Sequence, residues 1–152
     1  MVMKTKLIRQ RISIPEVLKH AGEEESVEDK ITVLKYFDDS NLRWFINSLY
    51  NWDWVNRMVI PPHKPSEIKA GLGYISFKKA TEILTLAYHS DNQAFKSKKI
   101  IQVLENVDCE NYRLFIMMLE NKRQIQGIHK SVFKKAYPQF FRLEATDEID
   151  VD

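Results

Sequence analysis

Cysteine is nearly absent from this chain of 152 residues, and the single Cys109 excludes an internal disulfide and any zinc site built on two or four cysteines. Glycine and proline are scarce, with four and five residues, which argues against collagen-like, disordered and turn-rich all-β chains. The longest uninterrupted apolar run, Leu114 to Leu119, falls far short of the roughly 20 residues that a membrane helix needs. The amino-terminal MVMKTKLIRQR carries the charges of a signal peptide without its apolar core. We therefore expect a soluble, cytoplasmic protein.

The sequence also lacks the residue patterns of catalytic and metal sites. The four histidines are scattered: no pair has the i, i+4 spacing of a helical zinc site, and there is no HExxH. Gly71-x-Gly73 is too short for a phosphate-binding loop. The carboxylates of the acidic segments lack the apolar surroundings that tune a general acid. We expect no catalytic residue, no metal and no cofactor, and hence not an enzyme.

The pattern of apolar residues and helix caps predicts an all-α fold. The segments that follow the predicted caps carry apolar residues at helical spacing, and no alternating strand pattern competes with them. We predict one helical domain over residues 1–142, followed by an acidic, disordered tail over 143–152. The domain divides into N-terminal helices (14–50), a proline-containing connector (51–75) with a short helix near Glu67–Ala70, and C-terminal helices (76–138). The predicted caps are Ser13, Ser26, Asp39 or Ser40, Ser76, Ser97 and Asp108.

Positive charge is concentrated in the body of the chain. Residues 57–142 contain 15 Lys or Arg and 7 Asp or Glu, whereas residues 143–152 contain five acidic residues and no basic one. A basic body with an acidic tail suggests a polyanionic partner. The alternative is a lysine-rich surface that only aids solubility.

Several of these cations are predicted to lie at helix starts. Lys78 and Lys79 follow the cap Ser76, and Lys98 and Lys99 follow the predicted cap Ser97. A cation in a first helical turn faces the positive end of the helix dipole, at a cost of about 0.3–1 kcal/mol. A bound phosphate reverses this argument, because free backbone N–H groups, serine hydroxyls and lysines together bind anions. The same argument includes Lys130 at the start of the last predicted helix, and Lys122 and Arg123, in the turn after the central helix, add to the set.

Aromatic residues gather between Arg43 and Trp54, in the sequence RWFINSLYNWDW. Trp44 falls opposite the apolar stripe of its predicted helix and could anchor a partner, since tryptophan is enriched at binding hot spots. Alternatively, the connector folds back and buries it. The candidate partner-binding residues are Trp44, Tyr50, Trp52 and Trp54.

The C-terminal half resembles the end of the N-terminal α-helical DNA-binding domain of ATP-dependent DNA ligases. The similarity covers about residues 92–141 and includes the stretch KKIIQVLENVDCENYRLFIMMLENKRQIQGIHKSVFKKAYPQFF. Residues 27–141, with the connector Pro61-Pro62-His63-Lys64-Pro65, resemble a family of small proteins of tailed phages related to the T-even type. The resemblance implies a ligase-like helical fold, a host-cell cytoplasmic location and phosphate contacts from residues 122–126, Gly127, Lys130 and Ser131. The ligase nucleophile motif, lysine-x-Asp-Gly, is absent, so the resemblance carries no ligase chemistry.

Together these observations predict a non-catalytic phage accessory protein that binds double-stranded DNA by its phosphate backbone, without sequence specificity. The alternative is a protein interaction module that acts on a phage replication or transcription complex, a virion component or a host factor. Neither a membrane nor a small-molecule substrate is expected. The predicted DNA-binding residues are Lys78, Lys79, Ser97, Lys98, Lys99, Lys122, Arg123, Gly127, Lys130 and Ser131.

Overall fold

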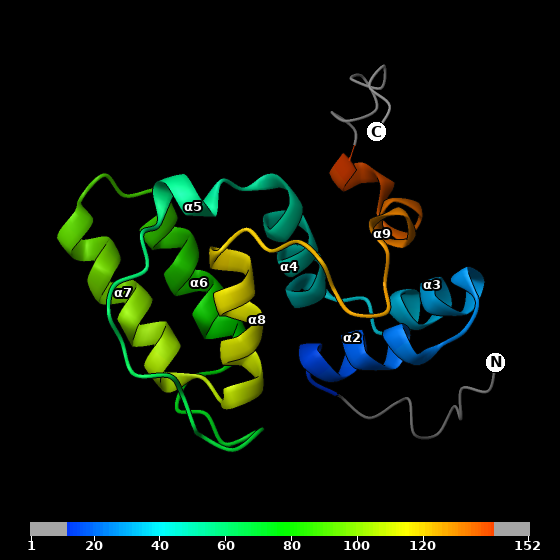
Figure 1. Cartoon of the computed structure of the whole chain (residues 1–152), viewed down its shortest axis with the longest axis horizontal. Helices are drawn as coiled ribbons and strands as arrows, with labels where there is room; N and C mark the ends of the chain where they lie inside the picture. The colour runs from blue at the N-terminus through cyan, green and yellow to red at the C-terminus, as the bar shows by residue number, and fades with distance from the viewer. Residues whose placement is uncertain (1–11, 142–152) are drawn as a thin grey trace. The chain divides into compact units, whose positions relative to one another are not determined.

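The structure is a computed structural model that describes residues 12–141, and within this range every regular element is a helix (Figure 1). The all-α class is therefore confirmed. The predicted acidic tail, residues 143–152, lies outside the described residues. The helices are α2 (Ile14–Glu23), α3 (Val27–Tyr36), α4 (Ser40–Asn51), α5 (Trp54–Arg57), α6 (Phe77–Tyr88), α7 (Gln93–Asn106), α8 (Cys109–Leu119), α9 (Lys130–Ala136) and a final 3₁₀ turn (Pro138–Phe141).

The described residues form two compact units. The terminal unit consists of residues 12–42 and 124–141 and contains α2, α3 and α9. The central unit consists of residues 43–123 and contains α5 to α8, while α4 begins in the terminal unit and continues into the central unit after Leu42. A single domain over residues 1–142 stays a prediction.

The terminal unit joins the two ends of the described chain. Ser13 and Glu16 form the predicted capping box of α2, and Ser26 caps α3 by accepting from the Asp29 N–H. α9 packs against α3, and both helices bury apolar side chains. The Tyr137 hydroxyl donates to Asp38 Oδ1 at 2.9 Å. The prediction grouped residues 76–138 as one helical half, whereas α9 belongs to the terminal unit and buries its apolar face with α3.

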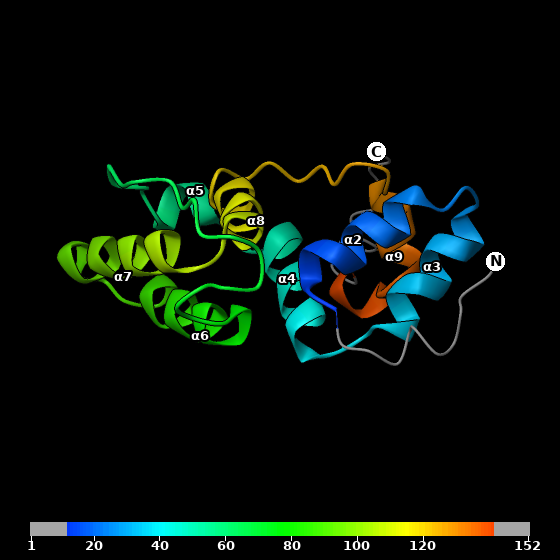
Figure 2. The same ribbon diagram turned by 90° about the horizontal axis from the view of Figure 1, so that it is seen from below.

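In the central unit, α6 and α7 form an antiparallel pair and lie side by side (Figure 2). Ser76 caps α6 as predicted. α7 differs from the prediction because it begins at Gln93, and Asn92 caps it by accepting from the Phe95 N–H at 2.9 Å. Ser97 therefore lies inside the helix and is not its cap, since the residues from Gln93 onward already continue a capped helix.

Residues 58–75 form an extended strap that is attached to the corner between α7 and α8. The Ser66 hydroxyl donates to Val107 O at 2.7 Å, and the Cys109 N–H donates to Ile68 O at 2.8 Å. The carboxylate of Asp108 caps α8 as predicted and also accepts from the Gly71 N–H at 2.8 Å. These bonds hold the strap in an extended form, so the short helix predicted near residues 67–70 is absent. The connector's helix is α5 instead.

Candidate nucleic-acid interface

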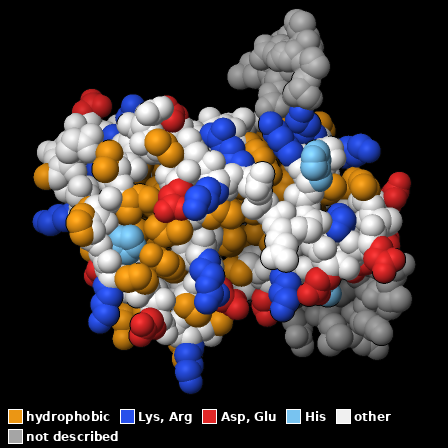
Figure 3. Space-filling view, viewed as in Figure 1, with side chains coloured by type: hydrophobic (Ala, Val, Ile, Leu, Met, Phe, Trp, Pro, Cys, Tyr) orange, Lys and Arg blue, Asp and Glu red, His pale blue; other side chains and the backbone are white. Residues whose placement is uncertain are grey.

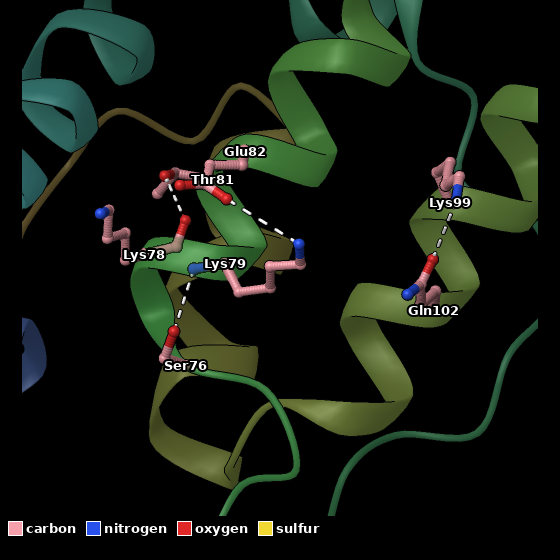
Figure 4. A network of polar contacts seen from close by, with 7 residues as sticks. All are labelled: Ser76, Lys78, Lys79, Thr81, Glu82, Lys99 and Gln102. Atoms are coloured by element: carbon pink, nitrogen blue, oxygen red, sulfur yellow. Dashed lines mark hydrogen bonds and ion pairs between the residues drawn. The ribbon is translucent and has the colours of Figure 1, made fainter.

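Lys78 and Lys79 are exposed in the first turn of α6, as predicted (Figure 4). The Lys79 N–H donates to the hydroxyl of the cap Ser76 at 3.0 Å. Lys79 Nζ lies 4.0 Å from a carboxylate oxygen of Glu82, and the two side chains are 59% and 53% exposed. Exposed ion pairs contribute only about 0–1 kcal/mol. The pair therefore leaves the Lys79 ammonium able to bind another anion.

Lys98 and Lys99 lie in the sixth and seventh positions of α7, so the first-turn argument does not apply to them. Lys99 Nζ donates to Gln102 Oε1 at 3.3 Å and lies 5.4 Å from the centre of the Phe95 ring. Figure 4 shows that Lys79 extends to the side of α6 on which Lys99 lies, and that Lys78 extends to the other side. The four lysines thus belong to two packed helices but do not all point in one direction.

Basic side chains also occur elsewhere on the surface. Figure 3 shows several lysine or arginine side chains together at the upper right of the viewed face, and acidic and apolar side chains between the basic ones elsewhere. Lys122 follows α8, and its ammonium pairs with Glu120 at 3.1 Å. Of the predicted cations, Lys122 thus already has an acidic partner.

Arg123 has a structural role in the central unit. Its Nε donates to Leu49 O at 2.8 Å, and a terminal guanidinium nitrogen donates to Trp52 O at 3.0 Å. Both carbonyls lie at or just after the C-terminal end of α4, where carbonyl groups lack helical partners and a positive charge is favourable. The positive charge predicted for DNA contact at this position therefore already stabilises the end of α4.

The hydroxyl of Tyr50 lies beside this arginine and donates to Arg123 O at 3.2 Å. Burial raises the pKa of Tyr50 to about 12, while the Arg123 guanidinium acts in the opposite direction with a smaller effect. The unfolded chain releases the phenol proton near its ordinary pKa of about 10, before the folded protein does. The contribution of Tyr50 is therefore fully present below about pH 10 and is lost as the pH rises toward 12.

We expect this difference to appear when wild type is compared with Tyr50→Phe. The stability advantage of wild type over the variant should be constant near neutral pH and shrink above about pH 10. Urea unfolding followed by circular dichroism, from about pH 8 to about pH 11, measures it. The comparison cancels the titration of lysines common to both proteins. An advantage that stays constant over the whole range would contradict the assignment.

Gly127, Lys130 and Ser131 belong to the terminal unit, so they are not in the same unit as the other predicted DNA-binding residues. Gly127 has a φ of 82° in a turn that the Ile128 N–H closes onto Ile125 O. Lys130 Nζ lies 6.0 Å from the centre of the Phe141 ring. The exposed Ser131 donates its N–H to the ring of His129, which caps α9.

The three tryptophans of the predicted partner-binding set contact one another and Tyr88, and Trp44 and Trp52 stay half-buried. Trp54 is fully buried, and Tyr50 is also buried. Trp52 and Trp54 stack with their ring centres 5.2 Å apart, and Trp52 lies 4.5 Å from Tyr88 of α6. The half-buried Trp44 donates from its indole N–H to Thr85 Oγ1 at 3.0 Å. The connector therefore folds back and half-buries Trp44, and the tryptophan rings pack α4 and α5 against α6.

One exposed apolar pair was not predicted from the sequence. Leu72 and Tyr74 lie in the loop just before the helix cap Ser76, and their side chains are 64% and 79% exposed. A sequence signal was present: the residues between Glu67 and Glu82 include three lysines and no acidic residue. Aromatic and basic residues in such a segment are typical of nucleic-acid contact.

The described residues contain no group of three or more His, Cys, Asp or Glu side chains that could hold a metal ion. No helix among residues 12–141 combines the length and the apolar character needed to cross a membrane. Comparison with protein-family models, curated proteins and solved structures found no match for the chain. The resemblances to ligase domains and to phage proteins therefore stay predictions.

Proposed function

We propose that the protein is non-catalytic and binds double-stranded DNA by its phosphate backbone, without reading the base sequence. The observation that carries the proposal is the set of accessible lysines on two packed helices, α6 and α7. Lys78, Lys79 and Lys98 are exposed and Lys99 is half-exposed. The central unit that carries them has 12 basic and 8 acidic residues, a net charge of +4.

The chemistry of these side chains favours phosphate contact over base recognition. A lysine ammonium is a compact point charge on a flexible stem, which suits phosphate oxygens at several positions. Contacts to phosphates position a protein on the duplex and carry no sequence information. The resemblance to ligase DNA-binding domains supports the same mode of binding, and the resemblance to tailed-phage proteins adds to the proposal a role as a phage accessory protein.

The test is a titration with a duplex of mixed sequence over a series of salt concentrations. Each phosphate contact changes the slope of log K against log salt by about −0.9. We expect a steep slope for wild type. Replacing Lys79 and Lys99 together by alanine should make it shallower by about 2 and weaken binding at low salt at least tenfold.

The matched control replaces Lys19 and Lys64 together by alanine. Both lysines are exposed and lie outside α6 and α7, and replacing them removes the same net charge as replacing Lys79 and Lys99. The control should keep nearly the wild-type slope. Wild-type binding without salt dependence, or an equal loss in both variants, would contradict the proposal.

A further inference from the structure

The loop before α6 presents Leu72 and Tyr74 to solvent in a fixed conformation. The Leu72 N–H donates to Lys69 O at 2.9 Å, and the Tyr74 N–H donates to Asn106 O at 2.8 Å. The Gly71 N–H is bound by the carboxylate of Asp108 at 2.8 Å. The backbone of the loop is thus attached on both sides of Leu72, while the two large side chains remain exposed.

The glycine between these residues explains how close the loop lies to α8. A Cβ at Gly73 would lie 2.7 Å from the Asp108 nitrogen, a distance that real Cβ atoms do not show. Only glycine allows this close approach, and the approach fixes the position of the loop beside the start of α8. Holding exposed apolar side chains on a preorganised backbone lowers the entropy lost when they bind a partner.

The charge around the loop indicates the chemistry of that partner. Lys69 lies just before the loop and Lys78 and Lys79 just after it, and all three are exposed. No acidic residue occurs from position 68 to position 81; of the acidic residues beside this segment, Asp108 is bound to the Gly71 N–H and Glu82 lies 4.0 Å from Lys79 Nζ. Negative charge beside an apolar surface would complement this segment, and a DNA minor groove offers both in its phosphates and in its deoxyribose and base faces.

We propose that Leu72 and Tyr74 contact the minor groove of the DNA that the lysines hold, and so supply the part of the binding free energy that salt does not screen. This inference rests on the proposed function and adds the groove and the residues that enter it. Proteins that bind the minor groove frequently insert apolar side chains against its base steps. Lysines 78 and 79 then contact the phosphates that border the groove.

The test compares wild type with a variant that combines Leu72→Ser and Tyr74→Ser, by duplex titration over the same salt series. We expect the variant to bind at least tenfold more weakly at every salt concentration, with an unchanged slope, because apolar contacts release no counterions. Leu86→Ser is the matched control. Leu86 is 59% exposed near the other end of α6, and its replacement should leave both affinity and slope unchanged.

The outcomes separate this inference from the proposed function. If wild type shows no salt-dependent binding, both fail. If wild type binds and the loop variant binds equally well, only the inference fails. Binding of wild type, but not of the loop variant, to phosphatidylglycerol vesicles in place of DNA would assign the loop to a membrane surface and overturn the inference. Circular dichroism checks that the exposed substitutions leave the fold intact.

Discussion

Replacing Trp54 by alanine is expected to lower the free energy of unfolding of the central unit by about 3–5 kcal/mol, the usual cost of removing a buried aromatic side chain. Trp54 has no exposed surface. Its ring lies 5.2 Å from that of Trp52 and 4.9 Å from that of Tyr88. The variant would also lose the hydrogen bond from the indole N–H to Ser48 O at 2.9 Å, which leaves a buried carbonyl without that donor.

Urea unfolding followed by far-UV circular dichroism measures the loss. Val55→Ala is the matched control, because Val55 is the next residue of α5 and is 47% exposed. Its replacement should change stability by no more than about 0.5 kcal/mol. A loss below about 1 kcal/mol for Trp54→Ala would show that the ring is not part of the core. It would also restore this tryptophan as a candidate for partner binding.

Helix starts could be predicted from the sequence because the interactions that fix them are local. The caps Ser13, Ser26, Ser76 and Asp108 each accept a hydrogen bond from a residue three positions later. Such a bond depends on a short segment alone. The start of α7 was missed because two polar residues, Asn92 and Ser97, both suit a cap, and the chain uses the earlier one.

The packing of the helices could not be predicted in the same way. The strap is held by bonds such as that from Ser66 to Val107 O, whose partners are 41 residues apart. The place of α9 beside α3 likewise depends on contacts between the two ends of the described chain, including Tyr137 with Asp38. Neither arrangement has a signature in the local spacing of residues.

The candidate site was predictable only in part, for the same reason. Lys78 and Lys79 are in a first helical turn because the cap before them is local. The role of Arg123 depends on Leu49 O, a partner 74 residues away in the sequence. From the sequence alone, Arg123 is a basic residue in a turn and so a candidate phosphate contact. In the structure its guanidinium binds the end of α4.

Gly127 was also assigned to DNA contact, and the structure leads to a different expectation for it. A Cβ at this position would lie 2.5 Å from Gly22 O and 2.7 Å from Gly22 Cα. The φ of 82° adds a conformational cost of about 1–2 kcal/mol for alanine. Since both neighbouring atoms belong to the backbone of α2, they cannot move away as a flexible side chain would, and forced overpacking costs about 1–3 kcal/mol. We therefore expect Gly127→Ala to destabilise the terminal unit by about 2–5 kcal/mol.

Gly71→Ala isolates the part of this cost that comes from close approach. Gly71 has nearly the same φ, 83°, but an added Cβ there would meet no atom within 4 Å. The Gly71→Ala variant should therefore lose only about 1–2 kcal/mol of unfolding free energy, the conformational cost alone, in the same urea unfolding measurement. Equal losses for the two variants would mean that the turn and α2 separate easily, and the requirement for glycine at position 127 would then come from its backbone conformation alone. A larger loss at 127 assigns this glycine to the packing of the turn against α2, whether or not DNA binds nearby.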